Sequence, residues 1–376
     1  MCIRDRTSAD VKAGIVEALD AVMERATVNS ADVTAVMIGT TQFTNAVIER
    51  RELSKTAIIR ACLPTGTGIP PMCDWPRDIA KELGTSQYSI LGGHIFDGTE
   101  IHPLDEEEIR RVVTDIRDRG IRALAIAAAF SPMDPSHELR IADIARELIP
   151  DANITLSHEI GRLGIIEREN AALLNAALGE LATRVVDSMT AALTERHINC
   201  PFYISQNDGT LMAADFIARY PALTFASGPT NSLRGAAALS GIDDAIVVDI
   251  GGTTSDVGVL AGGFPRESNS YVDVGGVRTN FRMPDIMAVG LGGGSLVSED
   301  GSQIGPQSVG HRLVTEGLVF GGRQLTTTDI IVADGLQDIG SPDHVKHLSP
   351  ELIEAATQTI HRIVDEAIDK MRPSDE

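Results

Sequence analysis

Residues 249–256, Asp-Ile-Gly-Gly-Thr-Thr-Ser-Asp, combine residue types and spacing that indicate phosphate chemistry. Two glycines and two threonines form a tight turn that offers backbone N–H groups and hydroxyls, the donors that an anionic phosphate needs. Asp249 and Asp256 flank this turn. Because phosphate oxygens repel carboxylates, acids in these positions indicate an intervening divalent cation, and Mg²⁺ held by carboxylates, waters and phosphate oxygens fits.

An ordinary β-hairpin is the alternative interpretation of the same segment. Gly-Gly turns and strand threonines are common, so a bare Gly-Gly-Thr string would favour the hairpin. The complete pattern, in which acids on both sides of the turn lead into apolar strands, is more specific and favours phosphate binding. The chain has no G-x-x-x-x-G-K-[ST] string, so this is not a Walker A loop.

Two apolar strands, 245–250 and 257–260, must position the turn. Glycines cluster over residues 251–322, where a missing Cβ lets the backbone approach a ligand closely. A second glycine-rich loop lies at 290–295. The pattern also predicts a helix over 349–372, capped by a serine and started by a proline.

The first half of the chain alternates short apolar strands with amphipathic helices, which predicts an α/β layered architecture. We expect strands at 35–38, 56–59, 121–129 and 154–156. We expect helices at 7–25, near 109–120 and at 134–148, and a helical stretch that follows the first strand and ends at 49. Residues 62–80 are expected to form an irregular Pro- and Gly-rich loop. The helix at 7–25 is expected to begin with a capping box from Thr7 to Asp10.

The longest helical pattern, from 164 to about 196, divides the chain. It predicts an N-terminal lobe over 1–163, a long connecting helix over 164–198 and a C-terminal lobe over 199–376.

Composition excludes several classes of partner. The chain has 53 acidic and 32 basic residues, for a net charge of −21, so we expect neither nucleic acid nor an anionic membrane as partner. Its longest apolar run, 123–130, is too short to span a bilayer, and its N-terminus has no apolar core typical of a signal peptide. Four cysteines without C-x-x-C spacing favour reduced thiols and a cytoplasmic protein.

Histidines beside acids are weak metal candidates. His158 and Glu159 are expected on an extended segment, where neighbours point to opposite faces and chelate poorly. The pairs at 94–97 and 137–138 give no stronger indication.

The turn at 249–256 resembles the second phosphate loop of the actin/Hsp70/sugar-kinase superfamily, and further strings resemble the hydantoinase A / 5-oxoprolinase family. These strings lie at 39–46, 157–161, 167–170, 206–212, 225–229, 290–295 and 308–310. They keep the family's order, and the resemblance covers nearly the whole chain after about residue 10.

The resemblance implies two actin-like (ribonuclease H-like) α/β lobes with ATP and Mg²⁺, or Mn²⁺, in a cleft between them. It implies an ATP-dependent hydrolase subunit that opens a cyclic amide such as a hydantoin or 5-oxoproline by phosphorylating the carbonyl oxygen, with a hydantoinase B-type partner. Alternatives are the ATP-using subunit of an acetone- or acetophenone-type carboxylase and an inactive actin-like binding scaffold; a sugar kinase is a more distant one. Homo-oligomerisation stays open.

The resemblance also implies roles for individual residues. The turn residues would hold the β- and γ-phosphates: Gly251, Gly252, Thr253 and Thr254. The second loop would face the nucleotide or the cleft through Gly292, Gly293 and Gly294. Asp249 and Asp256 would hold the cation or its waters, or position the attacking group. Candidates for the substrate are Thr40, Thr41, Asn45, Asn170, Asn207 and Asp208. Helix capping, a polar turn and a satisfied buried amide are the alternatives for this last group.

The chain departs from the family pattern at both ends. The first phosphate loop and the C-terminal adenosine loop have no counterpart, so we expect a truncated first lobe lacking its N-terminal strands. We therefore expect weak or absent ATPase activity from this chain as written.

Overall fold

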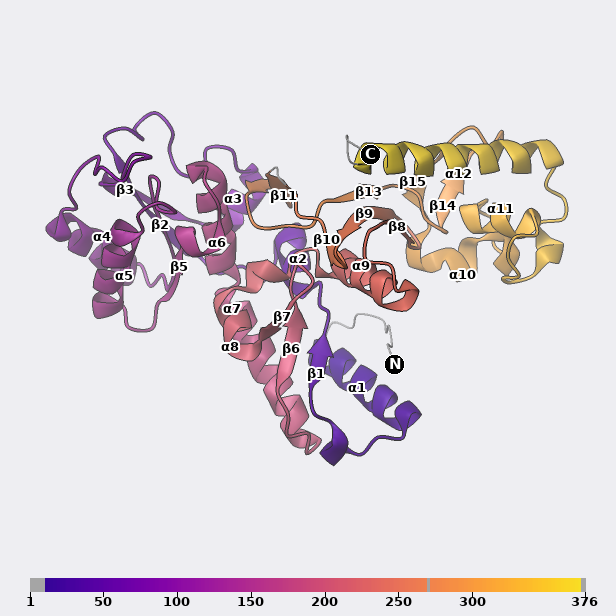
Figure 1. The fold of residues 1–376 in the computed structure, drawn as a ribbon, viewed down its shortest axis with the longest axis horizontal. Helices are drawn as coiled ribbons and strands as arrows, with labels where there is room; N and C mark the ends of the chain where they lie inside the picture. The colour runs from indigo at the N-terminus through magenta and orange to yellow at the C-terminus, as the bar shows by residue number, and fades with distance from the viewer. Residues whose placement is uncertain (1–10, 269–270, 373–376) are drawn as a thin grey trace. The chain divides into compact units, whose positions relative to one another are not determined.

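The computed structural model describes residues 11–268 and 271–372 (Figure 1). The chain forms two compact units. The first contains Met1–Gly228 and Ser268–Met283, and the second contains Pro229–Glu267 and Pro284–Glu376. In the described part of the chain, no helix is both long and apolar enough to cross a bilayer.

The first unit contains most of the helices and two main sheets. Its helices are α1 (Val11–Ala26), α2 (Gln42–Glu49), α3 (Arg77–Leu83), α4 (Glu106–Asp118), α5 (Ser136–Leu148), α6 (Ser157–Ile160), α7 (Ile165–Glu195) and α8 (Ala214–Arg219). Its strands are β1 (Val36–Ile38), β2 (Thr56–Leu63), β3 (Ser86–Leu91), β4 (Ala123–Ala128), β5 (Asn153–Leu156), β6 (Phe202–Ser205), β7 (Leu211–Ala213), β11 (Val272–Val274) and β12 (Val277–Thr279).

A four-stranded parallel sheet in the order β3-β2-β4-β5 is the core of this unit. Alternate residues of β2 and β4 point to opposite faces. Ile59 and Leu124 pack with α4 and α5 on one face, whereas Ile58 and Ala125 pack with α3 and α7 on the other. Both faces are covered, which explains why β4 is apolar throughout.

The unit boundary does not follow the expected lobe boundaries at 163 and 198, and strand pairing gives the reason. β6 pairs in parallel with β1 and antiparallel with β7, which joins the chain after the long helix to the first unit. The hairpin β11–β12 adds Val274 and Val277 to the core that surrounds α7.

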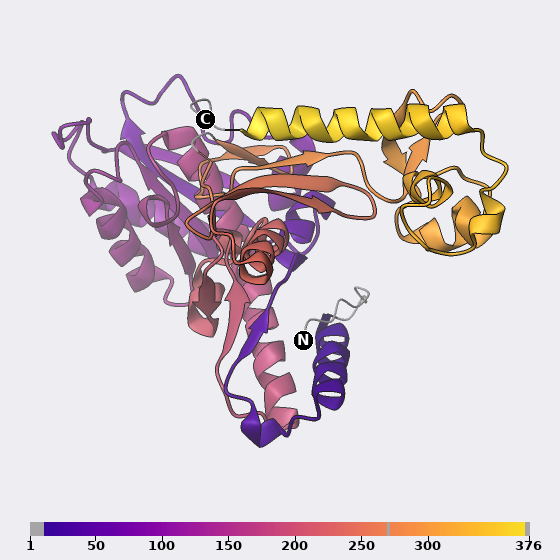
Figure 2. The same ribbon diagram turned by 45° about the vertical axis from the view of Figure 1, so that its right-hand side comes forward.

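The second unit is built on an antiparallel sheet and one long helix (Figure 2). Its elements are α9 (Ser227–Ser240, which begins in the first unit), β8 (Ala245–Ile250), β9 (Ser255–Ala261), β10 (Phe264–Pro265), β13 (Ile286–Val289), β14 (Ser295–Val297), β15 (Ile304–Ser308), α10 (Leu313–Glu316), α11 (Thr327–Ala333) and α12 (Pro350–Met371). β9 lies between β8 and β13. Leu233 of α9 covers one face of the sheet, and Ala367 and Met371 of α12 cover the other.

The structure confirms the elements with the strongest sequence patterns. These include the β8–β9 hairpin, the long helix α7 and the tail helix α12, in which Ser349 Oγ accepts a hydrogen bond from the Leu352 amide. The capping box predicted for Thr7 to Asp10 lies outside the described residues. The loop expected at 62–80 is wrong at both ends, because it contains the last residues of β2 and the first turn of α3.

Candidate functional site

The Gly-Gly-Thr-Thr segment forms the turn that joins β8 to β9. The Gly251 amide donates to the Thr254 carbonyl (2.9 Å). All four turn residues are exposed. Within residues 11–268 and 271–372, no hydrogen bond uses the amides of Gly252, Thr253 or Thr254. The turn therefore presents three adjacent donors with unused hydrogen-bonding capacity, an arrangement that suits an anion.

Asp249 and Asp256 lie directly opposite each other across this hairpin. Burial of the carboxyl, followed by the negative charge of Asp249, raises the pKa of Asp256 above its usual range. Among the described residues, no lysine, arginine or histidine forms an ion pair with either acid. Like charges in this position destabilise a sheet. A divalent cation or a shared proton would relieve the repulsion, so the two carboxylates fit a Mg²⁺ or Mn²⁺ ion.

The second glycine-rich loop, 290–295, supports the turn through its backbone. The Gly293 amide donates to the carbonyl of Gly251 (3.0 Å), and the Gly294 amide donates to that of Gly252 (2.7 Å). These bonds occupy the carbonyls of Gly251 and Gly252. The loop amides are thereby used inside the protein, which favours a supporting role over direct phosphate contact.

Gly292 allows the close approach of the two loops. A Cβ at this position would lie 2.6 Å from the Thr253 nitrogen and 2.8 Å from the Gly251 carbonyl oxygen. The Gly292 amide donates to Ser295 Oγ (2.9 Å). Only a glycine fits here without moving the 251–254 turn.

Two further segments fix the 290–295 loop. The amide and hydroxyl of Thr328, in α11, donate to the Gly293 carbonyl (2.9 and 2.8 Å). The Val309 amide donates to the Gly294 carbonyl (2.9 Å). The string at 308–310 and the start of α11 therefore form a backbone network behind the turn.

Thr40, Thr41 and Asn45 lie at the start of α2 in the first unit. The Gln42 amide donates to Thr40 Oγ1 (3.2 Å), and Asn45 Nδ2 donates to Thr41 Oγ1 (3.4 Å). The Thr40 carbonyl accepts a hydrogen bond from Ser227 Oγ (3.2 Å). These contacts organise the entry into the helix, and a substrate role for the three residues stays a prediction.

Asn170 is buried in α7 with its amide fully engaged. Its Nδ2 donates to Asp74 Oδ1 (3.2 Å) and to the Arg278 carbonyl (2.9 Å), and its Oδ1 accepts from Trp75 Nε1 (2.6 Å). These bonds favour a structural amide that ties α7 to the loop before α3 and to β12.

Asn207 and Asp208 lie in the turn between β6 and β7. Asn207 is buried, with Nδ2 3.4 Å from Met283 Sδ. Asp208 Oδ1 accepts hydrogen bonds from the amide and hydroxyl of Thr210 (2.9 and 2.6 Å). The segment is a polar turn, but it leads into β7, so the alternative that it caps a following helix is wrong. Substrate contact by this pair stays a prediction.

The string at 167–170 has a structural role that sequence reasoning missed. Glu169 and Arg60 form a buried bidentate ion pair, with Nε and Nη2 of Arg60 2.5 and 2.6 Å from the carboxylate oxygens. Arg168 donates to Ser157 Oγ (2.9 Å) and to the Ala128 carbonyl (2.7 Å). Together these bonds attach α7 to the parallel sheet.

The expectation that His158 and Glu159 are extended is wrong, because both lie in the short helix α6. His158 Nδ1 lies 2.6 Å from Glu138 Oε2. Glu159 accepts hydrogen bonds from Arg219 (2.7 Å) and from the Tyr220 hydroxyl (2.8 Å). The two side chains thus have separate protein partners. The structure instead brings together His94, Glu100 and His137, a cluster that local spacing did not indicate.

Comparison with known proteins identifies the family. The hydantoinase/oxoprolinase N-terminal region matches residues 4–149, and the hydantoinase/oxoprolinase family matches residues 168–370. Caprolactamase subunit alpha of Pseudomonas jessenii is 28% identical over 267 residues, which cover 69% of this chain and 37% of that protein. The acetophenone carboxylase gamma subunit of Aromatoleum aromaticum is 29% identical over 251 residues, which cover 63% and 34%.

A crystal structure of ATP-dependent caprolactamase from Pseudomonas jessenii has a similar fold. Its TM-score is 0.74 at 23% sequence identity, and the match covers 95% of this chain and 57% of that one. The chain therefore spans little more than half of the solved structure and about a third of the two relatives' lengths. Its fold is the mixed α/β fold of that caprolactamase. Because the two family segments together match most of the sequence, the chain belongs to the hydantoinase/oxoprolinase family.

Proposed function

We propose that the second unit binds the β- and γ-phosphates of ATP at the turn formed by residues 251–254. The observation that carries this proposal is the row of three exposed residues, Gly252, Thr253 and Thr254, whose amides form no hydrogen bond with any described residue and whose turn is held by the 290–295 loop. Asp249 and Asp256 would hold Mg²⁺ or Mn²⁺, which would neutralise phosphate charge when bound.

The reaction we propose is the ATP-dependent opening of a cyclic amide, such as a hydantoin, 5-oxoproline or a related lactam. Family membership and the similarity to a caprolactamase support this choice. An amide carbonyl is a poor electrophile, and its nitrogen is a poor leaving group. Transfer of phosphate to the carbonyl oxygen makes the carbon a better electrophile. Water can then add to this carbon, and the nitrogen leaves once it is protonated.

The bond changes balance with one ATP and two waters. The carbonyl oxygen bonds to the γ-phosphorus as the bond from that phosphorus to ADP breaks, and the amide proton leaves. Water adds to the activated carbon, and the protonated nitrogen departs, which opens the ring and leaves an acyl phosphate. A second water releases phosphate and the carboxylate. In these steps the turn amides stabilise charge on the transferring phosphoryl group.

A carboxylase subunit is the second candidate, because the acetophenone carboxylase relative matches as closely as the caprolactamase relative does. In that reaction the phosphorylated oxygen would belong to a ketone enolate, and bicarbonate would supply the new carboxyl group. Both candidates use the same phosphate turn and differ in the fate of the phosphorylated substrate.

We propose that the chain works in the cytoplasm with a hydantoinase B-type subunit that completes the reaction. The relatives carry subunit designations, alpha and gamma, which supports an assembly of several chains. Candidate substrate contacts in this proposal are Thr40, Thr41, Asn45, Asn170, Asn207 and Asp208.

The test is to co-purify the chain with its partner and measure phosphate release from ATP with a panel of lactams, hydantoins and ketones, with and without bicarbonate. Ring opening that consumes ATP without bicarbonate supports the hydrolase, whereas bicarbonate-dependent turnover of a ketone supports the carboxylase. Asp249→Asn should abolish either activity, and Asp338→Asn, which removes an exposed charge of the same unit, should not. If the assembly that contains Asp249→Asn is as active as the one that contains Asp338→Asn, the reaction does not depend on Asp249, which would favour a role of this chain as a binding scaffold.

A further inference from the structure

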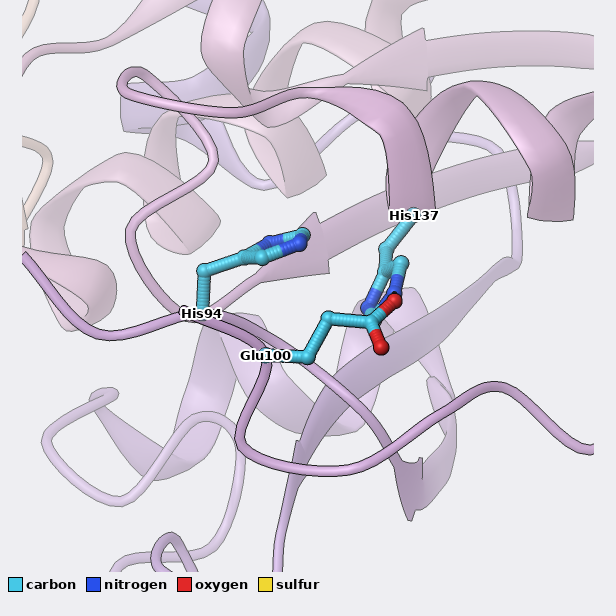
Figure 3. A group of neighbouring side chains, drawn as sticks. All are labelled: His94, Glu100 and His137. Atoms are coloured by element: carbon cyan, nitrogen blue, oxygen red, sulfur yellow. The ribbon is translucent and has the colours of Figure 1, made fainter. Parts of the chain in front are cut away.

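The first unit contains a cluster of two imidazoles and a carboxylate that the proposed reaction does not use. His94 lies in the loop after β3, Glu100 forms an isolated antiparallel bridge with it, and His137 lies in the first turn of α5. One potential ligand atom from each side chain lies within 4.8 Å of the other two. The three side chains come from two segments, the loop after β3 and the start of α5 (Figure 3).

The cluster lies at the carboxyl edge of the parallel sheet. The His94 amide donates to the Ala129 carbonyl (3.0 Å), just after β4, and the Ala129 amide donates to the Ala61 carbonyl (3.0 Å) of β2. In the order β3-β2-β4-β5, β2 and β4 are neighbours. After β2 the chain continues to β3 on one side of this pair, and after β4 it continues to β5 on the other side. This divergence at the carboxyl ends of strands is where open α/β sheets bind ligands.

His94 has a buried nitrogen with no partner among the described residues. Its side chain is 2% exposed, and its Nδ1 makes no hydrogen bond within residues 11–268 and 271–372. Buried polar atoms are nearly always paired, so an unpaired imidazole nitrogen requires an explanation. Its Nε2 lies 3.8 Å from Asp134 Oδ2, so a nearby carboxylate faces the other side of the ring.

His137 and Glu100 complete the donor set. The Gly93 amide donates to His137 Nδ1 (2.8 Å), so Nε2 carries the proton and donates it to Glu100 Oε1 (3.0 Å). A cation at Nε2 requires that proton to move to Nδ1, because a neutral ring keeps one proton. The Gly93 amide can then no longer donate to His137. Gly93 has a φ of +90°, a backbone conformation that favours glycine.

We propose that His94 Nδ1, His137 Nε2 and the Glu100 carboxylate bind a divalent transition-metal cation of the zinc class. Two imidazoles and one carboxylate suit Zn²⁺ or Co²⁺, whereas Mg²⁺ prefers oxygen ligands. Three protein ligands leave a fourth position for a water or carbonyl oxygen. The proposal is independent of the Asp249–Asp256 site and does not rest on ATP binding.

The test is a titration of the chelator-treated full chain with Co²⁺ and Zn²⁺. We expect one tightly bound ion per chain, with visible Co²⁺ absorption bands typical of nitrogen and oxygen ligands and no thiolate charge-transfer band. Glu100→Gln should weaken binding at least about tenfold. This side chain is 53% exposed, so the variant should fold normally. His94→Gln should show the same loss.

His102→Gln is the matched control, because His102 lies in the same loop, is exposed and is not in the cluster. It should bind Co²⁺ as the unmodified chain does. In the unmodified chain, the amide resonance of Gly93 should shift when Zn²⁺ is added. Absence of stoichiometric binding, or equal affinity of the Glu100, His94 and His102 variants once circular dichroism shows that each is folded, would overturn the proposal.

Discussion

Asp249 and Asp256 are directly opposed residues of neighbouring antiparallel strands, one on each side of the Gly-Gly-Thr-Thr turn. Two acids in this position are unfavourable for folding, and the raised pKa of Asp256 reflects this through burial and the charge of Asp249. A protein can keep such a pair when a bound cation uses it. Removal of one acid of the pair should therefore raise the stability of the fold and lower the activity.

The first prediction concerns Asp256→Asn. Without bound cation, the change should raise the free energy of unfolding at neutral pH by about 0.2–1 kcal/mol, because it removes a like-charge pair, while ATP turnover falls. Thermal unfolding and phosphate release measure the two effects. A variant that is less stable and still active would contradict this account.

The pH dependence of stability depends on the same group. Because the folded pKa of Asp256 is raised above its usual value of 3.8, the folded state holds the proton more tightly than the unfolded state does. The destabilisation caused by the ionised Asp256 carboxylate is present in full above the folded pKa. It disappears as the pH falls through the folded pKa toward 3.8. The stability difference between Asp256→Asn and the unmodified chain should therefore shrink over that range of acidic pH, as denaturant titrations can measure.

The third prediction concerns Gly252→Ala. A Cβ on Gly252 meets no protein atom within 4 Å, so the folded protein should tolerate it. If phosphate occupies this space, ATP affinity should fall about tenfold, equivalent to about 1.4 kcal/mol. Gly235→Ala is the matched control, because its Cβ also meets open space in the same unit. Unchanged ATP affinity in the Gly252 variant would place the phosphate elsewhere.

The fourth prediction concerns Gly292→Ala. The added methyl would lie 2.6 Å from the Thr253 nitrogen, so the two loops must separate. We expect a loss of about 1–3 kcal/mol in stability, the usual cost of overpacking, together with weaker ATP binding. Unfolding curves and ATP titration of the same sample test both effects, and a variant with normal values for each would show that the loops do not need this contact.

The fifth prediction concerns Glu169→Gln. The change leaves the Arg60 guanidinium buried without its counter-charge, which should cost about 3–5 kcal/mol. Glu180→Gln, on the exposed side of the same helix, is the control and should have little effect. A small effect of Glu169→Gln in denaturant unfolding would mean that water reaches Arg60 or that the unit rearranges around it.

Local pattern was sufficient to predict the β8–β9 hairpin and its turn, because strand, acid, turn and strand succeed each other within residues 245–260. The support from Gly293 and Gly294 was not predictable in detail. It depends on backbone bonds between segments that are distant in the sequence, and glycine patterns do not specify their partners.

The contacts of the histidines and of the 167–170 string depend on tertiary structure. His94 and His137 meet because the carboxyl ends of parallel strands share one edge of the sheet, a relationship that sequence spacing does not contain. His158 and Glu159 come directly after an apolar strand and were expected to continue it, but the chain bends into α6, where Glu138 binds His158. The polar string at 167–170 carries a buried ion pair whose partner, Arg60, lies inside an otherwise apolar strand.

Amide-resolved hydrogen exchange of the chain, with and without MgATP, tests the central claim most directly. Gly252, Thr253 and Thr254 are exposed residues, and their amides form no hydrogen bond with the described part of the chain, so these amides should exchange rapidly without nucleotide and slow markedly when MgATP binds. MgATP binding that protects other segments and leaves these three amides in fast exchange would contradict the assignment of the phosphate site.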